Sequence, residues 1–190
     1  SKSGSADVLE ASGVCLDLDV SQVANCIEAL GVGFMFAPAH HSAMRYAIGP
    51  RKELGMRTLF NVLGPLTNPA RVTRQVLGVY DAALCEPLAR ALQQLGSTHA
   101  LVLHSEDGLD EISVATSTHG VELKSGELAP IRIEPSDYGH GFDSLDGLQV
   151  ETADASAALI QSAFASDQDG ASCKARAIIA LNAGAGIYVS

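Results

Sequence analysis

The chain has 190 residues, of which 47% are hydrophobic, and it carries a formal net charge of −10 at pH 7. This length and apolar content are enough to bury one substantial core, so we expect a single domain over residues 1–190. The acidic charge argues against broad binding to nucleic acids or anionic membranes, and no apolar run approaches the length of a membrane span.

Helices dominate the expected structure of the first part of the chain. Residues 5–12 and 21–30 are predicted to be helical, and each segment is followed by a glycine that can end a helix. The short apolar run 33–37 is typical of a buried strand. A further helix is expected over residues 40–54, interrupted or kinked by a Gly-Pro pair.

The middle of the chain alternates between strands and a helix. Residues 75–80 and 99–104 are apolar and are predicted to be strands, and residues 84–95 between them are predicted to form a helix. Because two parallel strands need such a crossover, this order predicts an α/β fold with a mainly parallel central sheet covered by helices.

The pattern changes after residue 113. Segments 120–124 and 131–134 alternate in polarity on either side of a Ser-Gly turn, which predicts an antiparallel extension of the sheet. Residues 135–149 are expected to form a loop, and residues 153–165 and 173–188 to form helices.

The basic and proline-rich stretch 51–69 has the strongest local signal. Arg51 begins it, and the segment Gly64–Pro69 contains two prolines, a glycine and an asparagine, which predicts a rigid loop. A helix ending in a tight turn would also account for Gly64 and Pro65. The planar guanidinium of Arg51 suits a carboxylate ligand, although an ordinary surface arginine remains the alternative.

The first five residues, Ser1 to Ser5, place hydroxyl groups and a glycine just before the first predicted helix. Such a segment can direct hydrogen-bond donors at an anion, and the helix N-terminus adds partial positive charge. An ordinary serine N-cap is the alternative interpretation.

Acidic residues follow the predicted strand 99–104. Asp107, Asp110 and Glu111 lie where α/β sheets usually present ligand-binding loops, and adjacent carboxylates can bind Mg²⁺ together with substrate phosphates. A solvated acidic loop with no ligand is the alternative.

The remaining reactive side chains indicate no covalent chemistry. The four cysteines have no CxxC spacing, which favours reduced thiols and fits a cytoplasmic protein: Cys15, Cys26, Cys85 and Cys173. No Ser-His-Asp or Cys-His arrangement calls for a nucleophile, so we assign no catalytic residue.

Four colinear segments together resemble the anthranilate phosphoribosyltransferase family: residues 1–13, 31–45, 51–69 and 75–113. Members of that family begin with a small helical domain and a glycine-rich diphosphate loop, which would precede Ser1, and end with a helix that would follow Ser190. The resemblance therefore implies that the chain is most of the larger α/β domain of a two-domain enzyme, with the nucleoside-phosphorylase/phosphoribosyltransferase-like fold.

The activity implied by this resemblance is transfer of the 5-phosphoribosyl group from phosphoribosyl diphosphate to the amine of anthranilate, a step of tryptophan biosynthesis. The resemblance also implies a Mg²⁺ requirement, a cytoplasmic homodimer that pairs through the small helical domain, and no activity for these 190 residues alone.

The site residues implied by the resemblance fall into three groups. They are Arg51, Pro38, His41, Gly64 and Pro65 for anthranilate, with Arg51 contacting its carboxylate; Ser1 and Ser5 for phosphoribosyl diphosphate; and Asp110 and Glu111 for magnesium. The sequence departs from the family at Pro50, where many members have valine just before the key arginine.

Two other functions remain open at this stage. A pyrimidine nucleoside phosphorylase shares the architecture but uses a nucleoside and phosphate, without a magnesium-diphosphate requirement. Some relatives of the fold bind nucleic acid instead, but the net charge of −10 argues against that function here.

Overall fold

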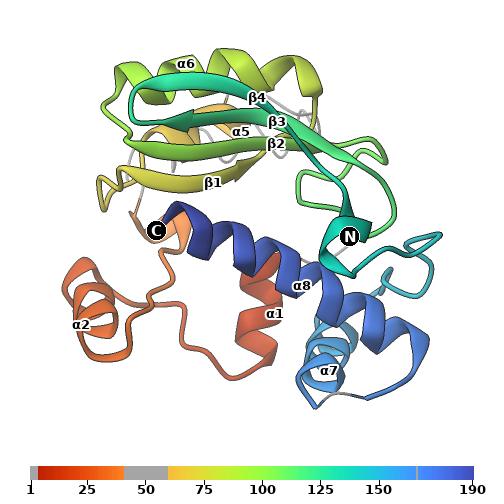
Figure 1. Ribbon diagram of the computed structural model, residues 1–190. Helices are drawn as coiled ribbons and strands as arrows, with labels where there is room; N and C mark the ends of the chain where they lie inside the picture. Colours follow the sequence, from red (N-terminus) through yellow and green to blue (C-terminus); the bar gives the residue numbers. More distant parts are fainter. Residues whose placement is uncertain (1–3, 41–59, 166) are drawn as a thin grey trace. The chain divides into compact units, whose positions relative to one another are not determined.

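The structure is a computed structural model, and the residues that it describes are 4–40, 60–165 and 167–190. The chain divides into two compact units (Figure 1). The units are Ser1–Thr58 with Val150–Ala158, and Leu59–Gln149 with Leu159–Ser190. The expectation that residues 1–190 form a single domain stays a prediction.

The first unit contains helices α1 (Ser5–Ala11), α2 (Val20–Leu30) and α3 (Ala37–His40). Both helices predicted before residue 31 are therefore confirmed. The start of α2 is fixed by a reciprocal pair of hydrogen bonds, in which Asp19 accepts from the Gln22 backbone N–H and Gln22 accepts from the Asp19 N–H, both at 2.9 Å. Such a capping box satisfies two N–H groups that the helix itself leaves without partners.

The strand predicted over residues 33–37 is wrong. This segment is irregular up to Phe36, and it folds back on α2 instead of pairing with another strand. A Cβ atom built on Gly33 would lie 2.8 Å from Ile27 Cγ1 and 3.0 Å from Val23 Cγ1. An apolar run does not specify its neighbour, and here the segment is only half-buried, with Gly33 close to a helix instead of a strand. Apart from its first residue, the helix predicted over 40–54 lies outside the part of the chain that the structure describes.

The second unit contains a four-stranded sheet in the order β1-β2-β3-β4, which confirms the α/β fold and the antiparallel extension. Its strands are β1 (Arg74–Gly78), β2 (His99–Ser105), β3 (Thr118–Lys124) and β4 (Glu127–Ile133). β1 and β2 are parallel, whereas β3 is antiparallel to both of its neighbours. The sheet is therefore mixed, and β4 starts earlier than predicted, directly after the turn at Ser125-Gly126.

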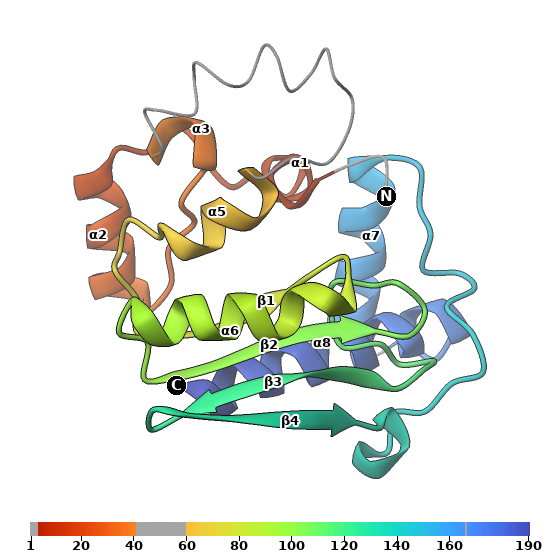
Figure 2. The ribbon, with the colours of Figure 1, turned by 90° about the horizontal axis from the view of Figure 1, so that it is seen from above.

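Helices cover both faces of this sheet (Figures 1 and 2). The crossover from β1 to β2 is made by the short 3₁₀ helix η2 (Ala82–Leu84) and by α6 (Cys85–Gln94), which packs on one face. The other face is covered by α8 (Gly170–Val189), which contacts β1 and β2. Because both faces of the sheet are covered, the central residues of both parallel strands, 76–78 and 100–103, are apolar.

Three further elements complete the described chain, and the first of them is helix α5 (Phe60–Leu66), which precedes β1. The predicted loop 135–149 begins with the 3₁₀ helix η3 (Pro135–Tyr138), and α7 (Ala153–Phe164) precedes α8. The helices predicted over residues 153–165 and 173–188 are therefore confirmed. Within the ranges that the structure describes, no helix has the length and apolar character needed to cross a bilayer.

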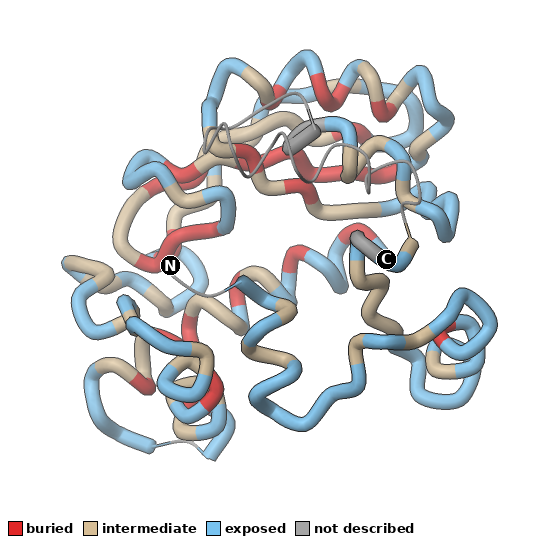
Figure 3. Tube along the Cα trace, turned by 180° about the vertical axis from the view of Figure 1, so that it is seen from behind, coloured by how far each residue is buried: buried red, intermediate tan, exposed pale blue. Residues whose placement is uncertain are grey.

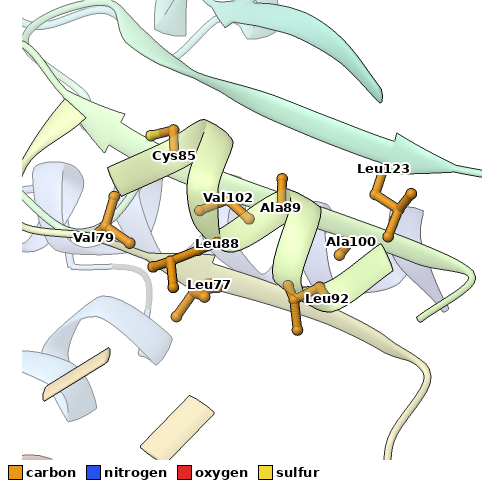
Figure 4. Packing of buried hydrophobic residues seen from close by; sticks show 9 residues of the cluster. All are labelled: Leu77, Val79, Cys85, Leu88, Ala89, Leu92, Ala100, Val102 and Leu123. Atoms are coloured by element: carbon orange, nitrogen blue, oxygen red, sulfur yellow. The ribbon is translucent and has the colours of Figure 1, made fainter. Parts of the chain in front are cut away.

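The core of the second unit follows from the alternation of side chains along β2. Ala100 and Val102 pack against α6, whereas Leu101 and Leu103 pack on the side of α8. Burial coincides with these facing surfaces (Figure 3), and each large apolar side chain buried there contributes about 1.5–3 kcal/mol. Figure 4 shows the first cluster, to which α6 contributes a stripe with helical spacing: Cys85, Leu88, Ala89 and Leu92.

A polar cluster joins the end of α8 to the sheet. Glu122 Oε1 lies 3.0 Å from His99 Nε2 and accepts a hydrogen bond of 2.9 Å from the Tyr188 hydroxyl, which in turn accepts one of 3.0 Å from Lys124 Nζ. The Tyr188 ring also stands edge-on to His99, with 5.0 Å between the ring centroids. Burial alone raises the pKa of Glu122, but the hydrogen bonds from His99 and Tyr188 outweigh it, and the net pKa is lowered.

Tyr188→Phe is expected to destabilise the fold in a pH-dependent way. Because the folded pKa of Glu122 lies below its ordinary value, the cluster stabilises the fold above that value, and the gain is lost as the pH falls through the folded pKa. Loss of one hydrogen bond to the carboxylate costs roughly 1 kcal/mol near neutral pH, and the difference should shrink at an acidic pH below the folded pKa of Glu122, where the carboxyl is protonated in both the folded and the unfolded protein.

Urea unfolding of the two proteins at both pH values checks this expectation. Tyr138→Phe is the matched control, because this tyrosine is exposed and takes no part in the cluster. An equal loss of stability at both pH values would mean that the hydroxyl does not act through the ionised Glu122.

Candidate functional site

The acidic pair predicted from the sequence lies at the end of β2. Because β1 and β2 are parallel, their carboxyl ends meet at one edge of the sheet, and Gly78 of β1 is in register with Leu103 of β2. Asp110 and Glu111 belong to the loop that leaves β2 at that edge. Ligand sites of open α/β sheets usually form in this position.

Gly78 allows the loop that carries Asp110 and Glu111, called the acidic loop below, to pass directly over β1. A Cβ atom built on Gly78 would lie 1.4 Å from the carbonyl oxygen of Asp110, a distance that no side chain can accommodate. A glycine inside a strand often marks such a close backbone approach. The backbone of Asp110 is therefore fixed by the shape of the strand beneath it.

A buried pair of hydroxyl groups holds the next residue of the loop. Ser105 Oγ donates to the carbonyl oxygen of Glu111 at 2.5 Å and lies 2.6 Å from Thr118 Oγ1. The backbone N–H of Ser113 donates to both hydroxyl oxygens at 3.1 Å. Ser105, Thr118 and Ser113 are fully buried, so these contacts have no competition from water and hold the loop firmly.

The four acidic side chains of this loop differ in what they contact. Glu106 lies 2.7 Å from the His119 ring, and Asp107 accepts a hydrogen bond of 2.6 Å from Ser113 Oγ. Within the part of the chain that the structure describes, the carboxylates of Asp110 and Glu111 have no such partner. The structure thus separates two carboxylates that support the loop from two that are available to a ligand.

The environment of Glu111 favours an incoming cation. The pKa of Glu111 is raised, first by desolvation of its carboxyl and second by the neighbouring charge of Asp110. The residue as a whole is nevertheless exposed. Both residues line a cavity of about 490 Å³ that is bounded by strands β1 and β2 and by α8. A cation placed there would relieve the repulsion between the two ionised groups.

These residues fit magnesium held jointly with a phosphate ligand. Among the described residues, no group of three or more histidine, cysteine or acidic side chains is placed to enclose a metal ion. Mg²⁺ commonly uses one or two carboxylates and completes its coordination with water and substrate phosphates. Asp110 and Glu111 supply that kind of partial site.

A second cavity, of about 520 Å³, lies elsewhere along α8, between that helix and strands β2 to β4. Its lining is mainly apolar, and its one acidic residue, Glu122, already contacts His99 and Tyr188. The cavity beside Asp110 is therefore the better candidate for chemistry, although it is slightly smaller.

The other predicted site residues are placed only in part. Ser5 is the exposed first residue of α1, and Pro38 lies in α3. Both belong to the first unit, whereas the acidic pair belongs to the second. Three more predicted residues lie outside the described ranges: Ser1, His41 and Arg51.

Gly64 and Pro65 are in the last turn of helix α5 (Phe60–Leu66), so the expectation of a loop from residue 64 onward is wrong. The irregular segment begins at Thr67, whose hydroxyl donates to the Leu63 carbonyl oxygen at 2.9 Å. A helix of seven residues tolerates Pro65 near its end because only one backbone hydrogen bond is lost there. Neither residue lines the cavity beside Asp110.

Three residues that shape the acidic loop were not predicted from the sequence. They are Gly78, Ser105 and Thr118. Gly78 had a usable signal, since a glycine within an apolar strand indicates that another backbone passes close by. The two hydroxyl residues had none, because their pairing depends on the register between β2 and β3.

Comparison with known proteins gives a consistent family. A family model described as the glycosyl transferase family, a/b domain, matches residues 1–190. The anthranilate phosphoribosyltransferase of Saccharophagus degradans is 60% identical over all 190 residues, which cover 56% of that protein. The enzyme of the same name from Teredinibacter turnerae is 57% identical over the same length and is also covered to 56%.

Solved structures agree with these sequence matches. The anthranilate phosphoribosyltransferase of Thermus thermophilus superposes with a TM-score of 0.83 at 38% identity, covering 98% of this chain and 54% of that chain. The Saccharomyces cerevisiae enzyme in complex with phosphoribosyl diphosphate and Mg gives 0.83 at 25% identity, with 99% and 52% covered. This chain spans about half the length of the curated relatives that it matches.

Proposed function

The chain belongs to the glycosyl transferase family, and from that premise we propose that it forms the larger α/β part of an anthranilate phosphoribosyltransferase. The reaction joins the 5-phosphoribosyl group of phosphoribosyl diphosphate to the amine of anthranilate and releases diphosphate. The observation that carries this proposal is the pair of carboxylates that follows β2, for which the described residues supply no partner, in a chain 60% identical to an enzyme of that name.

We propose Asp110 and Glu111 as the residues that hold magnesium. Bound there, Mg²⁺ would neutralise charge on the diphosphate as its bond to the sugar breaks. The Saccharomyces cerevisiae enzyme in complex with phosphoribosyl diphosphate and Mg supports a magnesium requirement, whereas the choice of these two residues rests on the family resemblance and on their position after β2. The raised pKa of Glu111 supports it as well, because desolvation and the charge of Asp110 both disfavour the ionised carboxyl when no cation is bound.

The other roles come from the family resemblance. The resemblance assigns Ser1 and Ser5 to phosphoribosyl diphosphate and Arg51 to the carboxylate of anthranilate, and it assigns four more residues to anthranilate: Pro38, His41, Gly64 and Pro65. The aromatic amine then attacks the anomeric carbon as diphosphate leaves, and the proton from the amine passes to solvent. Positioning and electrostatic stabilisation supply the rate enhancement, without a covalent intermediate on the protein.

Calorimetric titration of the full-length protein tests the proposal. Phosphoribosyl diphosphate should bind in the presence of Mg²⁺ and only weakly without it, and anthranilate should then bind to the loaded protein. Binding of uridine or thymidine with phosphate, and none of phosphoribosyl diphosphate, would instead identify a pyrimidine nucleoside phosphorylase.

Arg51→Ala should raise the KM for anthranilate about 10- to 100-fold, the loss expected for one charge-assisted contact to a carboxylate. The affinity for phosphoribosyl diphosphate should change little, because the arginine contacts only the aromatic substrate. Steady-state kinetics with each substrate varied in turn measure both effects. Arg90→Ala is the control, since Arg90 is exposed on α6 and pairs with Glu86. Equal weakening of both substrates would count against the carboxylate role.

The remaining expectations concern the whole protein. A homodimer that pairs through a small helical domain, a cytoplasmic location and inactivity of these 190 residues alone stay predictions. Size measurement of the full-length protein by light scattering tests the first of them.

A further inference from the structure

The side chain of Asn182 joins helix α8 to the acidic loop through two hydrogen bonds. Its Oδ1 accepts from the backbone N–H of Ile112 at 2.9 Å, and its Nδ2 donates to the carbonyl oxygen of the same residue at 2.9 Å. Nδ2 also donates to the carbonyl oxygen of Ile178, one turn earlier in α8, at 2.9 Å. One amide group therefore satisfies both backbone groups of a residue 70 positions away.

Ile112 is the residue that directly follows the acidic pair. Its side chain is 2% exposed and packs in the cluster that α8 forms with β2. Because the side chain of Ile112 is buried and its backbone is held by Asn182, the backbone that follows Glu111 cannot move independently of α8. The geometry requires a donor and an acceptor on one short planar group, which only asparagine supplies at this distance.

Three consecutive residues of the loop are thus fixed through their backbones from three directions. The Asp110 carbonyl lies against Gly78, the Glu111 carbonyl accepts from Ser105, and Ile112 is held by Asn182. This arrangement uses backbone groups only, so the carboxylates of the first two residues stay available. Asn182 also lines the cavity beside those carboxylates, which places it next to the ligand site.

We propose that Asn182 is a positioning residue that orients Asp110 and Glu111 for a divalent cation shared with a diphosphate. This inference rests on the proposed function and adds to it a residue on a different element. Supporting residues of this kind typically change metal affinity by about 10- to 100-fold when they are replaced. The effect should appear in the magnesium requirement and not in the binding of the aromatic substrate.

The test compares variants of the full-length protein by the Mg²⁺ concentration that gives half-maximal activity at saturating phosphoribosyl diphosphate, and by the Mg²⁺ concentration that gives half-maximal binding of phosphoribosyl diphosphate in calorimetry without anthranilate. Asn182→Ala removes every contact of the amide and is expected to raise both concentrations at least about tenfold. The KM for anthranilate should stay within about twofold, because that substrate does not contact the cation site.

Two further variants separate positioning from loss of stability. Asn182→Ser is the milder replacement, since its hydroxyl can bond to the Ile178 carbonyl within the helix but is too short to reach Ile112, and it should raise the magnesium requirement similarly. Val189→Ala is the control: Val189 is buried in the same helix and cluster, so the variant lowers the melting temperature, but it leaves the amide contacts between Asn182 and Ile112 in place.

The outcomes are distinguishable. An unchanged magnesium requirement in folded Asn182→Ala or Asn182→Ser would overturn the inference alone, and so would an equal rise in Val189→Ala. If the unsubstituted protein itself showed no magnesium-dependent binding of phosphoribosyl diphosphate, the proposed function would fail and the inference with it.

Discussion

Gly78→Ala is expected to abolish stable folding of the sheet edge or to displace the acidic loop. The added methyl group would lie 1.4 Å from the Asp110 carbonyl oxygen, and the clashing atom is backbone, which has no other rotamer to adopt. Overpacking of this kind typically costs about 1–3 kcal/mol and occasionally more, and this contact belongs at the upper end. Activity should fall with stability, because the displaced residue is one of the two proposed magnesium ligands.

Guanidinium unfolding and a magnesium titration of the variant measure the two effects. Gly186→Ala is the matched control, because Gly186 is a helical glycine of α8 with open space around its Cβ position. That substitution should leave activity unchanged and stabilise the fold by roughly 0.5–1 kcal/mol, the usual gain for alanine over glycine in a helix. A Gly78→Ala protein as stable and as active as the unsubstituted one would show that the loop does not pass over β1 as described.

Asp110→Asn combined with Glu111→Gln should have the largest effect on activity. The pair supplies the only protein ligands that we propose for magnesium, so the fall in kcat/KM should reach at least about 100-fold, the upper end of what outer-shell substitutions cause. The magnesium concentration needed for half-maximal activity should rise in parallel. Kinetics over a range of magnesium concentrations measure both quantities.

Stability distinguishes loss of the metal site from misfolding in this double variant. The pKa of Glu111 is raised by desolvation and by the charge of Asp110, so the ionised pair destabilises the fold without a cation, and the neutral amides remove that repulsion. The metal-free variant should therefore be no less stable than the unsubstituted protein. Glu106→Gln serves as the control, since Glu106 lies in the same loop but contacts His119. If the magnesium titration were unchanged in the double variant, the assignment of the metal ligands would be withdrawn.

Several elements could be predicted from local patterns alone. The strand-helix-strand order before residue 106 and the Ser-Gly turn between the antiparallel strands are confirmed, because side-chain periodicity and turn residues act within a few positions of each other. The same reasoning was wrong for residues 33–37, since an apolar run does not specify whether its neighbour is a strand or a helix.

The sequence by itself determined the fold class, the family resemblance and the choice of Asp110 and Glu111 as candidate metal ligands. Only the tertiary structure decided which carboxylates of the acidic loop are engaged, and which residues hold that loop. Glu106 and Asp107 find their partners at His119 and Ser113, and the loop backbone is fixed by residues as distant as Gly78 and Asn182. Such contacts depend on strand register and on the packing of α8 against the sheet, and neither is encoded in the spacing of neighbouring residues.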